Sequence, residues 1–451
     1  MIRHLERITV CIAGLLMAFV EPGTADGGNL LVRDVVLIDG TGSPAREGVD
    51  VLVRDGRIVR ITDTRLDAGD VEVIDGRGRF LVPGLIDGHT HPFPIEESFP
   101  QYVHFGVTSI FVPGCSDCDD ETLAAARART RAPGAAAPRF FHTSQHFTME
   151  GRHPAKTYVG SSWVDGKTIH YLDDVEEIGP LVERVTRQPI VGIKVTLEDG
   201  PTPPWVERMP QEFVDEIVVR AHAAGTKVFA HVSDDVELRM AAQAGVDHLL
   251  HFTGVDLDWE RDRPMLEDFR ARGLHWVTTM MLDKSFLYPV HPAWIDAVRE
   301  TEFFDAELDR LMAEGAGEEA TRERMRQIYG SDDVSFDTHP LLVKQSDDLR
   351  RLHEFGIPLV VGTDVGSPWI FPGYAVHEEM ALLEAAGIPA PDVLVMATRN
   401  AATMVGADDE IGTLTIGKSA DLLLVDRDPR VSVRNLRSIV AVYRDGVRVG
   451  P

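Results

Sequence analysis

The middle of the chain alternates short apolar segments with amphipathic helical patterns, and this alternation constrains the fold more than any other feature. Helical patterns such as Gln211–Ala224 and Gln345–Phe355 lie between the apolar segments. Eight successive strand and helix units are typical of a parallel (β/α)₈ TIM barrel, so an α/β fold is predicted. The eight predicted strands are Phe80–His91, Val107–Val112, Phe140–Thr143, Ile190–Thr196, Lys227–Val232, Asp247–Phe252, His275–Thr279 and Pro358–Asp364.

Both ends of the chain are rich in strand patterns. Asp55-Gly56 separates two apolar runs near the N-terminus, and Asp445-Gly446 does the same near the C-terminus, which is a hairpin signal. The two ends are therefore expected to pair into one small sheet domain beside the barrel. A long, charged and mostly helical segment near 282–342 lies between the last two predicted strands. We interpret it as a candidate lid, because the loops after barrel strands build the active-site face.

The N-terminus has the pattern of an export signal. Arg3 and Arg7 precede Ile8–Val20, an apolar run of about 13 residues, whereas a spanning helix needs roughly 20. Residues 1–26 are therefore predicted to be a signal peptide that directs the protein to the periplasm or the exterior. An uncleaved membrane anchor is the alternative. In an exported protein, Cys115 and Cys118 could form a disulfide, and two unpaired thiols are the other interpretation.

The net charge of the chain is −27 with histidine counted as neutral. Such a charge argues against nucleic acid or an anionic membrane as a partner. The expected partner is a small-molecule substrate, and a homo-oligomer is compatible with the sequence. Membrane contact is expected only if the N-terminal segment is not cleaved.

Polar residues stand at the ends of several predicted strands, where barrel enzymes place their catalytic groups. His89 and His91 are two residues apart, so an extended strand points both in the same direction. His231, His251 and Asp364 each follow apolar strand residues, where an unpaired polar group would be costly to bury. Neutral imidazoles and a carboxylate are natural ligands for a borderline metal ion such as zinc. This set predicts a metal site at the mouth of the barrel.

Three segments resemble the amidohydrolase superfamily, in particular its imidazolonepropionase-like and prolidase-like members. They are Phe80-Leu81-Val82-Pro83-Gly84-Leu85-Ile86-Asp87-Gly88-His89-Thr90-His91, the motif Gly362-Thr363-Asp364, and Ile411–Leu422. The resemblance implies a TIM barrel at 83–407 and a β-sandwich domain made of residues 27–82 plus 408–451. It also implies a water, activated by metal, that attacks a polarised carbonyl of an amide-type C–N bond.

Lys194 requires a separate interpretation, because an ammonium group has no lone pair with which to bind a metal. In binuclear members of the superfamily, the lysine at the end of the fourth strand is carboxylated and bridges two ions. The resemblance thus implies two divalent ions, most plausibly zinc, with N6-carboxylated Lys194 between His89, His91 and Asp364 on one side and His231 and His251 on the other. An unmodified lysine beside a single ion is the alternative.

Catalytic and substrate-binding roles are also expected. Asp364 would accept a proton from the attacking water and pass it to the leaving group. His142 lies near the end of the third predicted strand, His153 and Tyr158 follow it, and all three are candidates for substrate contact. Dipeptides, N-acyl amino acids and cyclic amides are the expected substrates. One alternative is a deaminase with a single metal, which the sequence disfavours because no glutamate follows His231 in Val232-Ser233-Asp234. A non-catalytic assembly protein is the third hypothesis.

Overall fold

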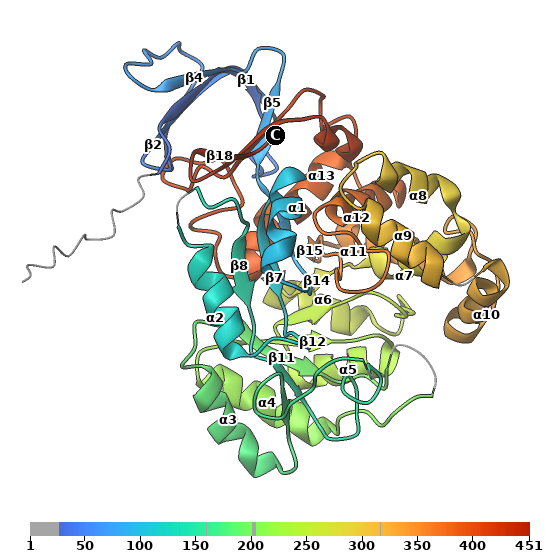
Figure 1. The fold of residues 1–451 in the computed structure, drawn as a ribbon. Helices are drawn as coiled ribbons and strands as arrows, with labels where there is room; N and C mark the ends of the chain where they lie inside the picture. Colours follow the sequence, from blue (N-terminus) through green and yellow to red (C-terminus); the bar gives the residue numbers. More distant parts are fainter. Residues whose placement is uncertain (1–26, 133, 159, 201–203, 316) are drawn as a thin grey trace, which may run out of the picture.

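The computed structural model describes residues 27–451 apart from 133, 159, 201–203 and 316. The predicted signal peptide at 1–26 therefore lies outside the described residues. The described chain has two parts, a β-sheet built from the chain ends and a larger α/β domain (Figure 1). No helix in these ranges is long and apolar enough to cross a bilayer.

The two chain ends pair in one eight-stranded sheet, which we call the end sheet. Strand β5 holds the two ends together, because it pairs in parallel with β1 and antiparallel with β16. This confirms the prediction that the ends form one sheet. Its strands are β1 (Leu30–Leu37), β2 (Arg46–Arg54), β3 (Arg57–Thr62), β4 (Glu72–Asp75), β5 (Phe80–Pro83), β16 (Leu422–Val425), β17 (Ile439–Arg444) and β18 (Val447–Gly450).

Both predicted hairpin turns are present. Asp55 and Gly56 have φ values of 48° and 75°, and Asp445 and Gly446 have φ values of 50° and 71°. Two successive residues with positive φ are the mark of a two-residue hairpin turn whose twist matches that of the strands, and Asp-Gly adopts it at low cost. The turns join β2 to β3 and β17 to β18.

The larger domain contains two parallel sheets, with orders β10-β9-β11-β12-β13-β14-β15 and β6-β7-β8. Each of the eight predicted strand segments contains a strand of these sheets, and the short strands β9 and β10 are additional. The strands are β6 (Leu85–Asp87), β7 (Val107–Val112), β8 (Arg139–His142), β9 (His146–Thr148), β10 (Ile169–Tyr171), β11 (Gly192–Thr196), β12 (Lys227–His231), β13 (His248–Leu250), β14 (His275–Val277) and β15 (Leu359–Val360).

Backbone hydrogen bonds join the two parallel sheets on both sides. Val191 N donates to His142 O at 2.9 Å between β8 and β11, and Gly88 N donates to Val361 O at 2.8 Å between β6 and β15. Alternate strand residues enter two different cores, as the period of two in a strand requires. One cluster includes Phe111, Phe229, Leu250, Val277 and Val360, and the other packs the opposite faces of the same strands with the helices. The domain is consistent with a TIM-barrel-like arrangement.

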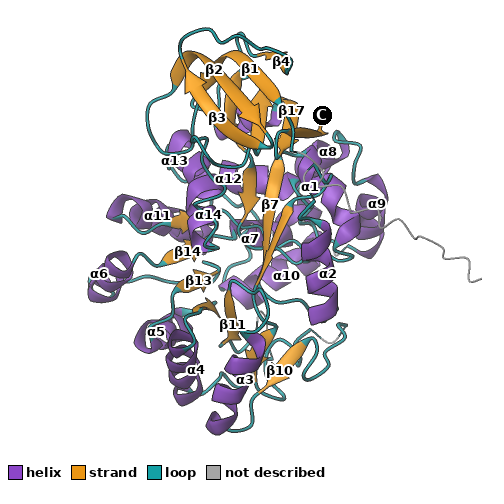
Figure 2. Cartoon of the chain, turned by 90° about the vertical axis from the view of Figure 1, so that its left-hand side faces the viewer, coloured by secondary structure: helices purple, strands orange, loops and turns teal. Residues whose placement is uncertain are grey.

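Helices cover the parallel strands on the outside (Figure 2). They are α1 (Phe99–His104), α2 (Asp120–Arg129), α3 (Ile178–Val185), α4 (Gln211–Ala223), α5 (Asp235–Ala244), α6 (Arg263–Arg272), α11 (Pro340–Phe355), α12 (Tyr374–Ala385), α13 (Ala390–Val395) and α14 (Ala401–Met404). The predicted helical patterns correspond to α4 and to the second part of α11.

Four further helices follow β14 and form the helical insertion: α7 (Met280–Leu287), α8 (Pro292–Arg299), α9 (Asp305–Glu314) and α10 (Glu318–Tyr329). They project from one side of the α/β domain (Figure 1). A separate apolar cluster that includes Phe304, Leu308 and Trp369 packs α7, α8 and α9 onto the segment after β15, whereas Met325 of α10 packs in the main core. Lys284 on α7 and Glu378 on α12 form a buried ion pair at 2.7 Å, which adds a polar link between the insertion and the barrel helices.

The predicted strand Phe80–His91 is in fact two strands, β5 and β6, which belong to different sheets. The chain passes between the sheets at Gly84, where a Cβ atom would lie 2.2 Å from Oγ1 of Thr108. Only glycine allows this close approach. A continuous apolar run does not reveal such a break, because both strands are buried.

Candidate metal centre

His89, His91 and Asp364 form a tight group at the ends of β6 and β15. Nε2 of His89 lies 3.0 Å from Nε2 of His91 and 3.3 Å from Oδ1 of Asp364. Nε2 of His91 lies 3.4 Å from the same Oδ1 of Asp364. Ligand atoms at roughly 2.0–2.2 Å from a tetrahedral zinc ion lie about 3.4 Å from one another. The three atoms thus have the spacing of one face of a coordination tetrahedron, and the donor set fits a divalent ion.

Backbone geometry brings these ligands together. Gly362 lies so close to His89 that a Cβ atom would be 2.8 Å from the Cβ of His89, which explains the glycine in the Gly-Thr-Asp motif. Nδ1 of His91 lies 2.9 Å from the carbonyl oxygen of Gly114. When Nδ1–H donates to that oxygen, Nε2 keeps its lone pair for a cation. Asp364 itself has a φ of 61°, a left-handed conformation that is uncommon for a residue other than glycine.

Lys194, His231 and His251 lie beside this group. The Lys194 amine is fully buried, and its Nζ is 3.4 Å from Nδ1 of His231. The ring centroid of His251 lies 4.0 Å from that of His231 and 4.3 Å from that of His89. Nε2 of His251 is buried and has no hydrogen-bond partner among the described residues. A buried, unpartnered imidazole nitrogen is costly unless it binds something, so this atom is suited to a metal.

Thr279, which the sequence did not single out, holds the other nitrogen of His251. Its hydroxyl lies 3.1 Å from Nδ1 of His251, and its φ is 48°. A β-branched residue with positive φ is strained, and such strain concentrates at functional sites. Both oxygens of buried Glu379 maintain the turn, because they accept backbone N–H groups of Met280 at 3.0 Å and Met281 at 2.7 Å.

Glu198 is a second residue that the sequence did not reveal. It is fully buried and contacts two imidazoles: Nε2 of His231 is 3.0 Å from Oε2, and Nε2 of His153 is in contact with Oε1. Glu198 lies four residues after Lys194 and therefore on the same side of an extended chain. The predicted strand ended at Thr196, and extending its period by two residues would have identified Glu198.

Burial dominates the electrostatics of the centre. Burial lowers the pKa of Lys194 to about 7, although Asp364 and Glu198 oppose this shift. Burial likewise raises the pKa of Asp364 to about 7, with Lys194 opposing. The pKa of His231 falls to about 4 and that of His91 to about 3, again through burial. Both imidazoles are therefore neutral at pH 7, which is the form that binds metal ions.

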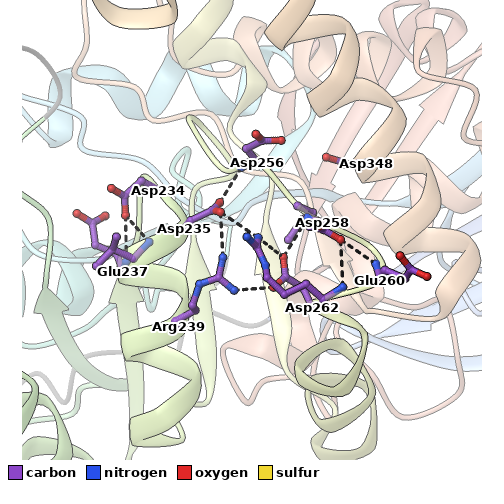
Figure 3. A network of polar contacts seen from close by, with 12 residues as sticks. Asp234, Asp235, Glu237, Arg239, Asp256, Asp258, Glu260, Asp262 and Asp348 are labelled. Carbon is purple, nitrogen blue, oxygen red and sulfur yellow. Dashed lines mark hydrogen bonds and ion pairs between the residues drawn. The ribbon is translucent and has the colours of Figure 1, made fainter.

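The loops after β12 and β13, which follow His231 and His251, are tied together by a network of acidic and basic side chains (Figure 3). Asp235 accepts the backbone N–H of Asp256 at 3.1 Å and a hydrogen bond from Arg239 at 3.0 Å. Arg239 also reaches Asp262 at 2.5 Å. Arg239 and a backbone N–H donor thus hold these carboxylates in place, and the contacts link the two loops.

A cavity of about 1040 Å³ opens above the centre. Glu198, His231, His251 and Asp364 lie in its wall, together with residues of α7, α9 and α10. The helical insertion therefore borders the same cavity as the predicted ligands. A pocket of this size accommodates a substrate of drug-like dimensions.

A model of the amidohydrolase family matches residues 80–449. The chain belongs to the amidohydrolase family.

The imidazolonepropionase of Syntrophobacter fumaroxidans is 27% identical to this amidohydrolase over 418 residues, which cover 87% of the chain and 88% of the relative. The N-acyl-D-aspartate deacylase of Alcaligenes xylosoxydans xylosoxydans is 41% identical over 97 residues, which cover 21% of the chain and only 18% of that relative. The solved structure of an Xaa-Pro dipeptidase with bound methionine in the active site is similar to this chain, with a TM-score of 0.71 and 20% sequence identity. The matched region covers 93% of this chain and 99% of that chain, and this similarity supports the fold.

The three predicted substrate residues of this amidohydrolase occupy different places. Tyr158 lines the cavity and is partly exposed. His153 is buried behind Glu198, and the described cavity wall does not include it. His142 points away from the cavity, because it lies on the same face of β8 as Phe140, whose ring centroid is 5.9 Å from its own and which packs in the core toward the helices. The structure thus brings only Tyr158 to a position where it can touch a bound molecule.

Glu198 provides a prediction for the amidohydrolase site. Its contact with Nε2 of His231 leaves Nδ1 facing Lys194, the arrangement in which a carboxylate orients a metal-ligating imidazole. We expect Glu198→Gln to weaken metal binding at the centre about 10- to 100-fold, as found when such orienting partners are lost. Metal titration of the chelator-treated protein measures this. Exposed Glu207→Gln is the matched control, and equal affinities in the two variants would contradict the role.

Proposed function

We propose that this amidohydrolase uses metal-activated water to hydrolyse an amide-type C–N bond of a dipeptide, an N-acyl amino acid or a cyclic amide. The observation that carries the proposal is the clustering of His89, His91 and Asp364 with tetrahedral spacing beside Lys194, His231 and His251. Four of the residues named in the centre also line a cavity large enough for such a substrate. We further propose that the two parallel sheets form one closed (β/α)₈ barrel with this centre at its mouth, and that the end sheet is a β-sandwich.

We also propose two divalent ions, preferably zinc, with carboxylated Lys194 between them. A lysine must be a neutral amine to attack CO₂, and burial that lowers the pKa of Lys194 to about 7 makes a neutral amine available near pH 7. The neutral amine would add to CO₂ through a new N–C bond and release one proton to solvent, which leaves an anionic carbamate whose two oxygens can bind metal, unlike an ammonium group. His89, His91 and Asp364 would hold one ion, and His231 and His251 the other.

Bound divalent ions would lower the pKa of a water molecule and polarise the scissile carbonyl. Asp364 is placed to accept a proton from the attacking water at its carboxylate and to return it to the leaving nitrogen. His251 is held by Thr279 through Nδ1, so its Nε2 has a fixed position beside the reacting centre. Glu198 keeps the ring of His231 from rotating, because it holds Nε2. The insertion reduces access of bulk water to this space.

Export of the protein remains part of the proposal. The apolar run Ile8–Val20 after Arg3 and Arg7 supports a signal peptide. The pairing of Cys115 with Cys118 in a disulfide is compatible with an oxidising compartment. Detection of the mature N-terminus in a cell fraction tests this.

The activity is tested by screening zinc-loaded protein against dipeptides, N-acyl amino acids and lactams. We expect hydrolysis of at least one member, loss of activity after chelation, and its return when zinc is added, with two equivalents of metal in the active form. Chelator-insensitive hydrolysis would contradict the proposal, as would fully metal-loaded protein that hydrolyses no member. Release of ammonia from an aminated heterocycle with one equivalent of metal would favour the deaminase alternative.

A further inference from the structure

Three arginine residues, Arg208, Arg310 and Arg324, lie in the described wall of the cavity, and their ion pairs differ. Arg208, on the loop before α4, is paired with Asp199, Asp234 and Glu237, so its charge is more than neutralised. Arg310 on α9 is paired with Glu314 one turn away at 2.8 Å. Both therefore already have carboxylate partners within the protein.

Arg324 on α10 differs from the other two. It lines the cavity, and among the described residues no carboxylate oxygen lies within 4.0 Å of its guanidinium nitrogens. The guanidinium carbon lies 5.1 Å from the ring centroid of Phe286, which also lines the cavity. An aromatic ring under the guanidinium restrains its plane while leaving its N–H groups free for a further partner.

We propose that Arg324 binds the carboxylate of an anionic substrate whose C–N bond lies at the metal centre; this inference rests on the proposed function. A planar guanidinium fork matches a carboxylate with two parallel hydrogen bonds. The net charge of the chain is −27, so its overall field repels anions. A cation without a carboxylate partner, such as Arg324, can attract an anionic substrate locally.

The remaining walls indicate the other half of the substrate. Phe286, Trp205 and Trp369 line the same cavity and offer aromatic surface to an apolar group. The preferred substrate class is therefore an N-acyl amino acid or a dipeptide with a bulky apolar part and a free carboxylate. A neutral cyclic amide would leave Arg324 without a partner and should be a poor substrate.

The test compares an acid with its neutral amide. N-benzoylglycine and N-benzoylglycinamide share the scissile benzoyl amide, and only the first carries a carboxylate. For the zinc-loaded wild type we expect the acid to be preferred in benzoate release and in calorimetric binding. Arg324→Ala should lower kcat/KM for the acid about tenfold, at the low end for a charge-assisted pair of hydrogen bonds because Arg324 is exposed, and leave the amide unchanged. The kcat/KM of Arg324→Lys for the acid should lie between those of the wild type and Arg324→Ala, because lysine keeps the charge but lacks the planar guanidinium fork.

Arg326→Ala is the matched control. Arg326 lies on the same helix, is paired with Glu323 and is absent from the described cavity wall. Equal binding of acid and amide by the wild type would overturn the role of Arg324, as would equal effects of the two alanine variants. Failure of the wild type to hydrolyse either compound would count against the proposed function alone, because the calorimetric preference would still report on Arg324. Undetectable binding of the acid at millimolar concentration would overturn the inference.

Discussion

If carboxylated Lys194 bridges two ions as proposed, Lys194→Ala should lower kcat/KM roughly 1,000-fold, the equivalent of several kcal/mol of transition-state stabilisation. The variant should retain one equivalent of metal on His89, His91 and Asp364, because their spacing does not depend on the lysine side chain. Inductively coupled plasma mass spectrometry and steady-state kinetics on the same preparation measure both effects. Added acetate should restore part of the activity, since a small carboxylate can enter the space that the side chain leaves.

Lys227→Ala is the control for this experiment. Lys227 stands at the other end of the neighbouring strand β12, where its amine lies 3.2 Å from Nε2 of His248, far along the strand from the centre. We expect this variant to keep two equivalents of metal and nearly full activity. A Lys194→Ala protein with two equivalents and unchanged kcat/KM would exclude the bridging role.

Asp364→Asn is expected to lower kcat about 10²- to 10⁴-fold, the range for loss of a positioned general acid and base. Asparagine has nearly the same shape, and its amide oxygen can still face a metal ion, but it cannot take up a proton. Metal content should fall less than activity, which separates proton transfer from ligation. Comparison of kcat with metal occupancy at pH 7 measures the difference.

Asp283→Asn is the matched control for Asp364→Asn. Asp283 is another buried carboxyl whose pKa burial raises to about 7, and it is hydrogen-bonded to the hydroxyl of Tyr329 rather than placed among the ligands. The kcat of Asp283→Asn should stay within about tenfold of the wild-type value, because Asp283 does not transfer a proton in the reaction. If Asp364→Asn kept its kcat with full metal occupancy, another residue would have to move the proton.

The positions of the strands could be predicted well, because each is a short apolar run bounded by turn residues. Two kinds of error have physical causes. The three-residue strands β9 and β10 are too short to show a period, and the pairing of β9 with β11 and of β10 with β9 depends on tertiary contacts. The division at Gly84 depends on the approach of Thr108, which is distant in sequence.

The site was partly predictable for a similar reason. Residues at strand ends follow the strand period, so His89 and His231 could be identified from local sequence. His142 was assigned to the site by proximity in sequence, although its parity with Phe140 places it on the helix side. Thr279 and Glu379 act through a turn that joins residues about a hundred positions apart, and no local pattern indicates such a pair.

The strand that leads to His89 has a consequence for the order of folding. β5 lies between β1 and β16 in the end sheet, and it continues through Gly84 directly into β6. β16 begins at Leu422, more than 330 residues after β5 ends at Pro83. The strand that leads to His89 is therefore anchored on both sides only after β16 has been synthesised, and contacts of such long sequence separation form slowly. A truncation that removes the last thirty residues should cost the protein its metal centre, although every ligand would remain in the chain.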